Sequence, residues 1–436
     1  MSAAAARRKK QIQKRADAAN AAATSVGDSD PIQLRLDSLL RDPTLKEESV
    51  AYEALQLAQS AVRRNIKLGN TVNATEVAYT SSLALLTASG RASVSSQLLA
   101  VLVQVLNETN TLCTDLWVSR FTELDLAHKR ALDGDTNMSS EERGRLKRLH
   151  LQFLKKGLKW SNDYGSVRYG HTGMHLLLGE HCWDMSCDET VVGTAAERAE
   201  RAAANANNNN NNANEEDEYD DDEDEDYLEI ALRNEAVSHY ALAEKIDVIL
   251  AKLKSLPAPT AEELAMGHTC LPAQRDALLT RSILVLLAIE NLRDAKALAL
   301  SYLRDIENTA SGRSDDELKA SYLDKTDGKA PSHIMFVCML LRICEKDVKT
   351  APLFTWLVRN FGAELGTMHD PEVIKTYTTK IGRVYFDIQP PPSMMNMMEN
   401  MMSMMGGGGG MGGGGMGGMN PAAMMQAMQA MQGGGM

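Results

Sequence analysis

Apolar side chains recur at steps of three and four residues along most of this sequence. In the stretch from Tyr52 to Leu68, one such series comprises Leu55, Ala58, Val62 and Ile66. Because an α-helix completes a turn in about 3.6 residues, this spacing places the apolar side chains on one helical face. The Gly-Asn pair at 69–70 is a typical helix end. The pattern therefore predicts an amphipathic helix that packs against neighbouring helices.

The same periodicity predicts helices from Pro31 to Ile388. A helix that contains Ala74 follows Gly69, and one that contains Ser95 follows Gly90. Further helices are predicted at 98–106, 113–127, 227–253, 278–289, 295–306, 333–343, 351–365 and 370–388. Small residues return after about one helix and turn, as in stacked helix pairs, although no strict repeat consensus is present. We predict an all-α fold, a tetratricopeptide-like right-handed α-solenoid of helix pairs.

Two of the predicted helix starts carry recognisable capping residues. Ser139 and Glu142 have the spacing of a capping box, in which each side chain bonds a free backbone amide at the helix start. Asp370 stands directly before Pro371, the pattern of an N-cap followed by proline at the first helical position.

The stretch from Lys155 to Asp184 is predicted to form a helix, a loop and a second helix. The first helix is expected to end at Trp160, before turn-forming residues at 161–166. Residues 170–178 begin a second apolar helix, which is expected to continue past Asp184 through residues 197–201. The first residues of this second helix are polar, which suits a site where a partner protein binds.

Three segments lack the apolar pattern. They are a basic arm at 1–30, an Asn-rich and acidic insertion at 205–226, and a Met/Gly-rich tail after Pro390 to Pro392. Such sequences bury too little apolar surface to offset chain entropy, so we predict disorder in all three. The predicted organisation is thus arm (1–30), N-terminal solenoid half (31–204), insertion (205–226), C-terminal solenoid half (227–388) and tail (389–436).

Charge and hydropathy narrow the class of protein. The formal net charge of the 436 residues is −12, and eleven acidic residues lie between Glu215 and Asp226. The remainder is therefore near neutral, which argues against nucleic-acid binding. Purely apolar runs such as 283–289 are far shorter than the ~20 residues of a membrane span, and the six cysteines form no CxxC pair. We expect a soluble, cytosolic protein with reduced thiols and no membrane insertion.

The histidines and cysteines near the centre are residue types that can bind zinc. The candidate set is His171, His175, His181, Cys182 and Cys187. Thr172 stands where a zinc-protease motif has glutamate, and no second ligand pair follows, so we predict no metal and no cofactor. The alternative is that His175 caps and packs at the helix entry while the thiols lie in the core. Phosphate-binding loops and nucleophile elbows are also absent from the sequence, which predicts a protein that is not an enzyme.

Three groups of residues resemble the Golgi-to-ER traffic protein four (Get-four) family. The central group is L-K-W-S at 158–161 followed by Y-G-H-x-x-x-H-x-L-L-G at 169–179. The front group comprises Tyr-Glu-Ala at 52–54, Arg64 and Ala-Thr-Glu at 74–76. The last is Ile-Gly-Arg-Val-Tyr-Phe at 381–386 with the prolines after it. Their order and spacing match over about Asp30 to Ser403.

The resemblance implies a non-enzymatic adaptor in the targeting of tail-anchored membrane proteins to the ER. In that family the N-terminal half docks a targeting ATPase (Get-three-like) and the C-terminal half holds a ubiquitin-like protein (Get-five-like). Animal versions add a larger chaperone-like subunit, and contact with tail-anchored clients is indirect. The alternative from another class is a generic solenoid subunit of a large assembly, of the proteasome-lid or translation-factor type.

The resemblance also implies three ATPase-docking residues. Arg64 matches an arginine that pairs with a carboxylate of the ATPase, although an ordinary solvated arginine is equally consistent with the sequence. Gln97 replaces an acidic residue of the family, and it can form hydrogen bonds but no ion pair. His175 would lie on the same docking surface.

Three interpretations stay open for the role of the tail segment at 394–405, which as a helix would be apolar on almost every face. Its methionines are Met394, Met395, Met397, Met398, Met401, Met402, Met404 and Met405. Methionine adapts to varied apolar surfaces, so the segment suits transient contact with a client transmembrane segment. The competing interpretations are packing on the ubiquitin-like partner and a low-complexity tail without a role.

Overall fold

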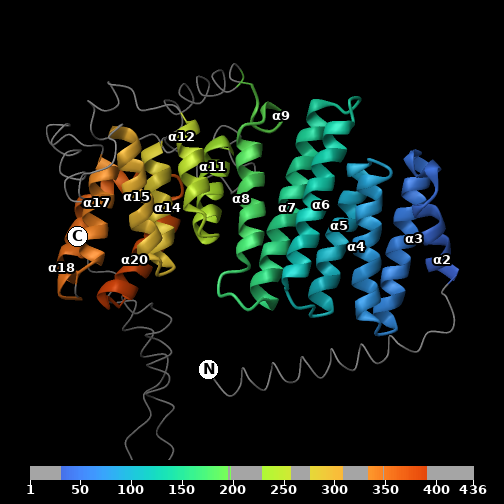
Figure 1. Ribbon diagram of the computed structural model, residues 1–436, viewed down its shortest axis with the longest axis horizontal. Coiled ribbons are helices and arrows are strands. Elements are labelled where there is room, and N and C mark those ends of the chain that lie inside the picture. Colours follow the sequence, from blue (N-terminus) through green and yellow to red (C-terminus); the bar gives the residue numbers. More distant parts are fainter. Residues whose placement is uncertain are drawn as a thin grey trace, which may run out of the picture. The chain divides into compact units, whose positions relative to one another are not determined.

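The computed structural model describes residues 31–194, 197, 228–256, 275–307, 332–346 and 348–389. Every regular element in these ranges is a helix, and the β-type contact they contain is an isolated bridge between Arg168 and Gly170. The predicted all-α fold is thus confirmed. The chain divides into two units, Met1–Ile388 and Gln389–Met436, and all the helices described below belong to the first (Figure 1).

The helices follow one another in chain order. The first nine elements are α2 (Pro31–Leu40), the 3-10 helix η1 (Pro43–Lys46), α3 (Glu48–Lys67), α4 (Thr71–Thr87), α5 (Ala92–Glu108), α6 (Asp115–Gly134), α7 (Ser140–Tyr164), α8 (Thr172–Ser186) and α9 (Glu189–Val192). The others are α11 (Leu228–Leu242), α12 (Ile246–Ser255), α14 (Arg275–Ala288), α15 (Leu292–Glu307), α17 (Ser332–Cys344), η3 (Val348–Thr350), α18 (Ala351–Asn360), α19 (Gly362–Gly366) and α20 (Pro371–Phe386).

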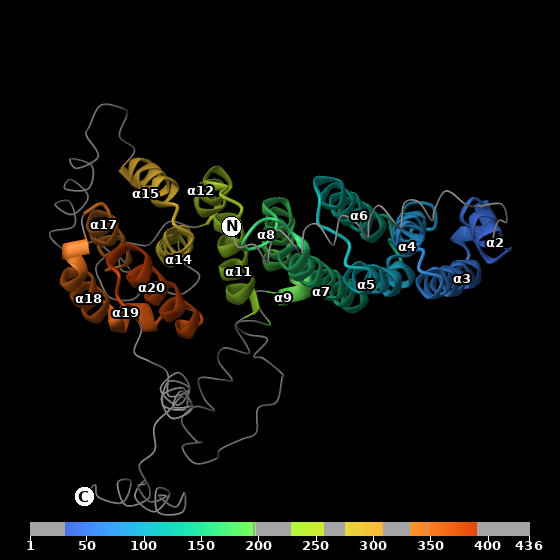
Figure 2. The same ribbon diagram turned by 90° about the horizontal axis from the view of Figure 1, so that it is seen from below.

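Packing between helices is mostly between near neighbours in the chain. Helix α3 packs on α2 and α4, α5 packs on α4 and α7, and α8 packs on α7 (Figure 2). The most extensive pairing joins α8 to α11, although residues 187–227 separate these helices in sequence. One hydrophobic core therefore continues from the N-terminal helices into the C-terminal ones. This neighbour-to-neighbour stacking is the α-solenoid arrangement that the sequence predicts; its handedness stays a prediction.

Helix α14 is the centre of the C-terminal group. Every residue from Asp276 to Ala288 is buried, and the helix packs on α11, α15, α17 and α20. A helix that is covered all round needs apolar residues on every face, which explains the long apolar run at 283–289. The turn to α15 is short and passes through Glu290, whose φ is +70°. The apolar run therefore lies in the protein core, in agreement with its being too short to span a membrane.

Several predicted helix ends are wrong. The predicted helix at 98–106 is the second half of α5, which is continuous from Ala92. Helix α7 runs past Trp160 to Tyr164, because the indole is fully buried and its Nε1–H donates to the Thr111 carbonyl at 3.0 Å. The predicted helix at 351–365 is divided at Phe361 into α18 and α19. In each case tertiary packing or a local break decides the boundary, which local propensity does not specify.

The prediction that one helix continues past Asp184 is also wrong. Helix α8 ends at Ser186, and α9 begins after Asp188. The Asp188 carboxylate accepts a hydrogen bond from the Thr190 backbone N–H at 2.8 Å, so it caps a new helix. The end of the predicted helix, residues 198–201, lies outside the described residues.

The predicted caps are confirmed in part. The Ser139 hydroxyl accepts from the Glu142 N–H at 3.1 Å, but the Glu142 carboxylate pairs with the Arg145 guanidinium at 2.6 and 2.7 Å. Half of the capping box is therefore formed. Asp370 caps α20 as predicted, accepting from the Val373 N–H at 3.2 Å with Pro371 at the first position.

Other predictions lie outside the described residues. They concern the arm at 1–30, the insertion at 205–226 and the methionines at 394–405. The domain boundaries likewise stay predictions. None of the helices within the described ranges is long and apolar enough to cross a membrane.

Candidate functional site

The predicted docking residues Arg64 and Gln97 are both exposed, on α3 and α5. Short turns join α3 to α4 and α4 to α5, so α3 and α5 run in the same direction, and they pack directly on each other. Arg64 lies in the last turn of α3, whereas Gln97 lies in the second turn of α5. The two side chains therefore lie toward opposite ends of this helix pair.

His175 is not at the surface. Only 3% of it is exposed; its Nε2–H donates to the Tyr169 carbonyl at 2.8 Å, and its Nδ1 lies 2.9 Å from Nδ1 of His239 on α11. Burial, together with the nearby His239, lowers the pKa of His175 to about 4. Its helix, α8, packs on α6, α7, α9 and α11 rather than on α3 or α5. His175 thus joins α8 to α11, and the three predicted residues do not form one cluster.

The helix entry is capped by His171 rather than by His175. The Nδ1 atom of His171 accepts a hydrogen bond from the Gly173 backbone N–H at 3.1 Å, and its Nε2 lies 3.0 Å from the Asp115 carboxylate. The sequence interpretation that His175 caps this helix is therefore wrong, while the expectation that it packs there is correct. His171 is the better placed because the N-cap residue has extended backbone angles and precedes the first turn.

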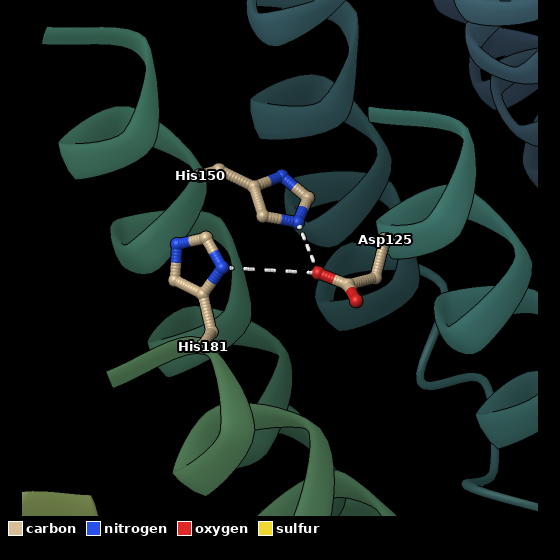
Figure 3. A group of neighbouring side chains, drawn as sticks. All are labelled: Asp125, His150 and His181. Carbon is tan, nitrogen blue, oxygen red and sulfur yellow. Dashed lines mark hydrogen bonds and ion pairs between the residues drawn. The ribbon is translucent and has the colours of Figure 1, made fainter. Parts of the chain in front are cut away.

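A second group of polar side chains is buried where α6, α7 and α8 meet. Asp125, His150 and His181 come from these three helices in turn and point toward one another (Figure 3). The His150 Nε2–H donates to Asp125 Oδ1 at 2.9 Å, and His181 Nδ1 lies 3.9 Å from the same oxygen. The ring of His128, also on α6, stacks on that of His150 with centroids 3.9 Å apart. All four residues are at most 5% exposed.

The electrostatics of this cluster follow from its burial. Burial lowers the pKa of His128 well below its ordinary value, and it lowers the pKa of His181 to about 3. For Asp125, burial opposes ionisation, but the hydrogen bond and charge of His150 and the charge of Lys129 lower the pKa of the carboxyl. The cluster thus holds an ionised Asp125 carboxylate beside His128 and His181, whose imidazoles burial keeps neutral.

Comparison with known proteins identifies the family. A family model described as Golgi to ER traffic protein 4 matches residues 69–405, more than half of the chain. The chain belongs to this family. Among solved structures, it is similar to "Crystal structure of C. therm. Get4", with 17% identity and a TM-score of 0.44 over 90% of this chain and 99% of that chain. No match was found among curated proteins.

Membership of the Golgi to ER traffic protein 4 family confirms the resemblance seen in the sequence and relates the chain to Golgi-to-ER traffic. The family match includes Gln97 and His175 but begins after Arg64. The docking roles of all three residues are therefore proposals.

Of the five residues weighed as zinc ligands in the sequence, only His181 belongs to the buried cluster of this Golgi to ER traffic protein 4 family member. Cys182 is buried and Cys187 is exposed, and neither is among the clustered donors. Sequence reasoning missed Asp125, His128 and His150. The sequence does contain one indication of the cluster. The three polar residues stand at the spacing of the buried helical faces that contain Phe121 in α6 and Phe153 in α7.

Proposed function

We propose that this protein is a non-enzymatic cytosolic adaptor in the targeting of tail-anchored membrane proteins to the ER. It links a targeting ATPase, held by the N-terminal helices, to a ubiquitin-like protein, held by the C-terminal helices. The observation that carries the proposal is the family match over residues 69–405. The physical task of such an adaptor is to raise the effective concentration of a client-loaded partner beside the ATPase.

The packing of the helices supports this role. One core runs from α2 to α20, with α8 and α11 forming its most extensive pairing. Helices that share a continuous close-packed core deform little, so a partner bound at α3 or α5 is held in a defined relation to one bound at α18. An adaptor that works through effective concentration benefits from that stiffness.

The C-terminal helices offer an apolar surface for a protein partner. Leu353 and Trp356 are each 54% exposed and lie three residues apart on α18. Val384 is exposed on α20, which packs on α18. Exposed tryptophan and leucine on one helical face are typical of an interface, where tryptophan often contributes most of the binding energy. We assign the ubiquitin-like partner to this surface.

Two substitutions test the two assignments, and each is the control for the other. Arg64→Glu reverses an exposed charge on α3, and it should weaken ATPase binding by about tenfold or more while leaving the ubiquitin-like protein bound. Trp356→Ala should do the opposite, with a loss of about 2 kcal/mol or more for the ubiquitin-like protein. The measurement is a pulldown followed by titration of each purified partner.

The proposal is contradicted if neither substitution weakens the binding of one partner while leaving the binding of the other unchanged. The competing proposal, a subunit of a large proteasome-lid or translation-factor assembly, predicts a different result. In that case affinity purification would recover a many-subunit particle without an ATPase or a ubiquitin-like protein.

A further inference from the structure

In the buried group of Asp125, His150 and His181, two hydrogen-bond acceptors face each other without a donor between them. The Nε2 of His181 faces the Lys147 carbonyl at 3.2 Å, and a carbonyl only accepts, so the proton of neutral His181 is on Nε2. Its Nδ1 is then a lone pair. This lone pair is 3.9 Å from Oδ1 of the Asp125 carboxylate and has no hydrogen-bond partner among the described residues. Two buried acceptors therefore face each other.

Such an arrangement is costly unless a positive group lies between the acceptors. Each unsatisfied buried polar atom destabilises the fold, and this cluster has several. His150 Nδ1 and both ring nitrogens of His128 are also without partners in the described part of the chain. Purely structural histidines in a helical core are normally satisfied.

The spacing of the donors fits a metal ion. His150 Nε2, His181 Nδ1 and a carboxylate oxygen of Asp125 all lie within 4.8 Å of one another. Donors bound to zinc at about 2.0–2.2 Å in a tetrahedron lie roughly 3.4 Å apart. The distances from Asp125 Oδ1 to His150 Nε2 and His181 Nδ1, 2.9 and 3.9 Å, bracket that value.

The groups around the donors are those that usually orient metal ligands. The His181 Nε2–H bond to the Lys147 carbonyl fixes the tautomer and the direction of the ring. The second oxygen of Asp125 lies 3.3 Å from the Lys129 ammonium, which also pairs with Asp184. Lys129 thus orients the carboxylate, and its charge is shared with a second acid outside the cluster.

We propose that Asp125, His150 and His181 form a structural binding site for a divalent transition-metal ion, with zinc the best match to two imidazoles and one carboxylate. Bound metal replaces the proton that His150 Nε2 now shares with Asp125, and this proton moves to His150 Nδ1. The ion clamps α6, α7 and α8 together within their shared core. His128, whose ring stacks on that of His150, is a further imidazole beside the site.

Binding of Co²⁺ and Zn²⁺ tests the site directly. Full-length protein is freed of metal by a chelator and titrated with Co²⁺, with long equilibration because the site is buried. The expected result is about one bound ion per chain, visible as d–d absorption without thiolate charge-transfer bands. Asp125→Asn and His181→Asn should each weaken Zn²⁺ binding by about tenfold or more. The control His333→Asn changes a buried histidine on α17 and should bind as the wild type does.

Circular dichroism shows whether each variant is folded. If neither ligand variant folds, X-ray absorption of the zinc-loaded wild type decides, because the site requires a first shell of nitrogen and oxygen with scattering from two imidazoles. The proposal is overturned if the wild type binds no ion, if sulfur is found in the shell, or if both folded ligand variants bind zinc as tightly as the wild type.

Discussion

Buried histidines are the most informative single residues in this protein. His128, His150, His175, His181 and His333 are each at most 3% exposed. A buried imidazole is held neutral, so folding is linked to pH through the cost of charging it. His333 is the simplest case: its pKa is lowered to about 4 by burial alone, and its Nδ1 has no partner among the described residues.

His333 should therefore make the fold sensitive to acid. The unfolded chain takes up the proton near pH 6.5 and the folded chain only near pH 4, so stability is complete above 6.5 and falls as the pH drops through this window. Between pH 7.5 and 5 this one residue should cost about 2 kcal/mol. His333→Leu removes the term. Urea unfolding at the two pH values should show a loss smaller by that amount in the variant, and an unchanged loss would refute the assignment.

At this scale the sequence predicts local contacts well and distant ones poorly. Asp370 was found from its neighbours because a cap bonds an amide only three residues away. Asp125 and His150 were not found, since 25 residues separate them and their contact depends on how α6 packs on α7. The Glu142 carboxylate was assigned to the wrong partner for a related reason: Arg145, an exposed cation one turn on, competes for it.

Close contact between helices depends on glycine at particular positions. At Gly157 on α7, an added Cβ would lie 2.5 Å from Cε1 of Phe121 and 3.0 Å from Cε of Met174. Phe121 cannot retreat easily, because it stacks on both Phe153 and Trp160. The absence of a side chain at Gly157 is thus what lets α7 approach α6 and α8.

Gly157→Ala should destabilise the protein by about 1–3 kcal/mol through overpacking, although alanine is the better helix former by up to about 1 kcal/mol. Gly134→Ala is the matched control. It is also in a helix, at the end of α6, but nothing lies within 4 Å of its added Cβ. Denaturant unfolding of both variants should show a loss only at Gly157; equal effects would mean that α7 does not pack as described.

The existence of the helices was predictable because hydrophobic periodicity is a local property of the sequence. Their ends were less so. The sequence pattern predicts Trp160 as the last residue of its helix. Its indole N–H, however, donates to the carbonyl of Thr111 in the loop between α5 and α6, and α7 continues for another turn. The break at Phe361 is marked by Gly362, which directly follows it and begins α19.

For the whole molecule, the pairing of α8 with α11 is the decisive contact, because it joins the helices on either side of residues 201–227. Its centre is tight, since a Cβ at Gly179 would lie 2.9 Å from the Tyr240 ring. Ion pairs of 2.9 Å also join α7 to α11, through Lys155 and Glu235, and α8 to α12, through Glu180 and Lys252. The two predicted halves of the chain therefore share one core.

This pairing should survive a cut in the chain. With a specific protease site placed within residues 205–226, the two fragments should elute together after cleavage, because buried apolar surface holds them. Adding Gly179→Val should drive α8 from α11, so that the cleaved fragments separate. Separation of the fragments without that substitution would show that the connecting segment, and not the α8–α11 contact, holds the halves together.

The proposed adaptor role is a property of the entire chain, and assembly from purified components tests it most directly. The chain, the targeting ATPase and the ubiquitin-like protein are mixed and analysed by size-exclusion chromatography with light scattering. We predict one complex that contains all three, with both partners bound at once. Mutually exclusive binding of the two partners, or failure of either to bind, would contradict the adaptor role.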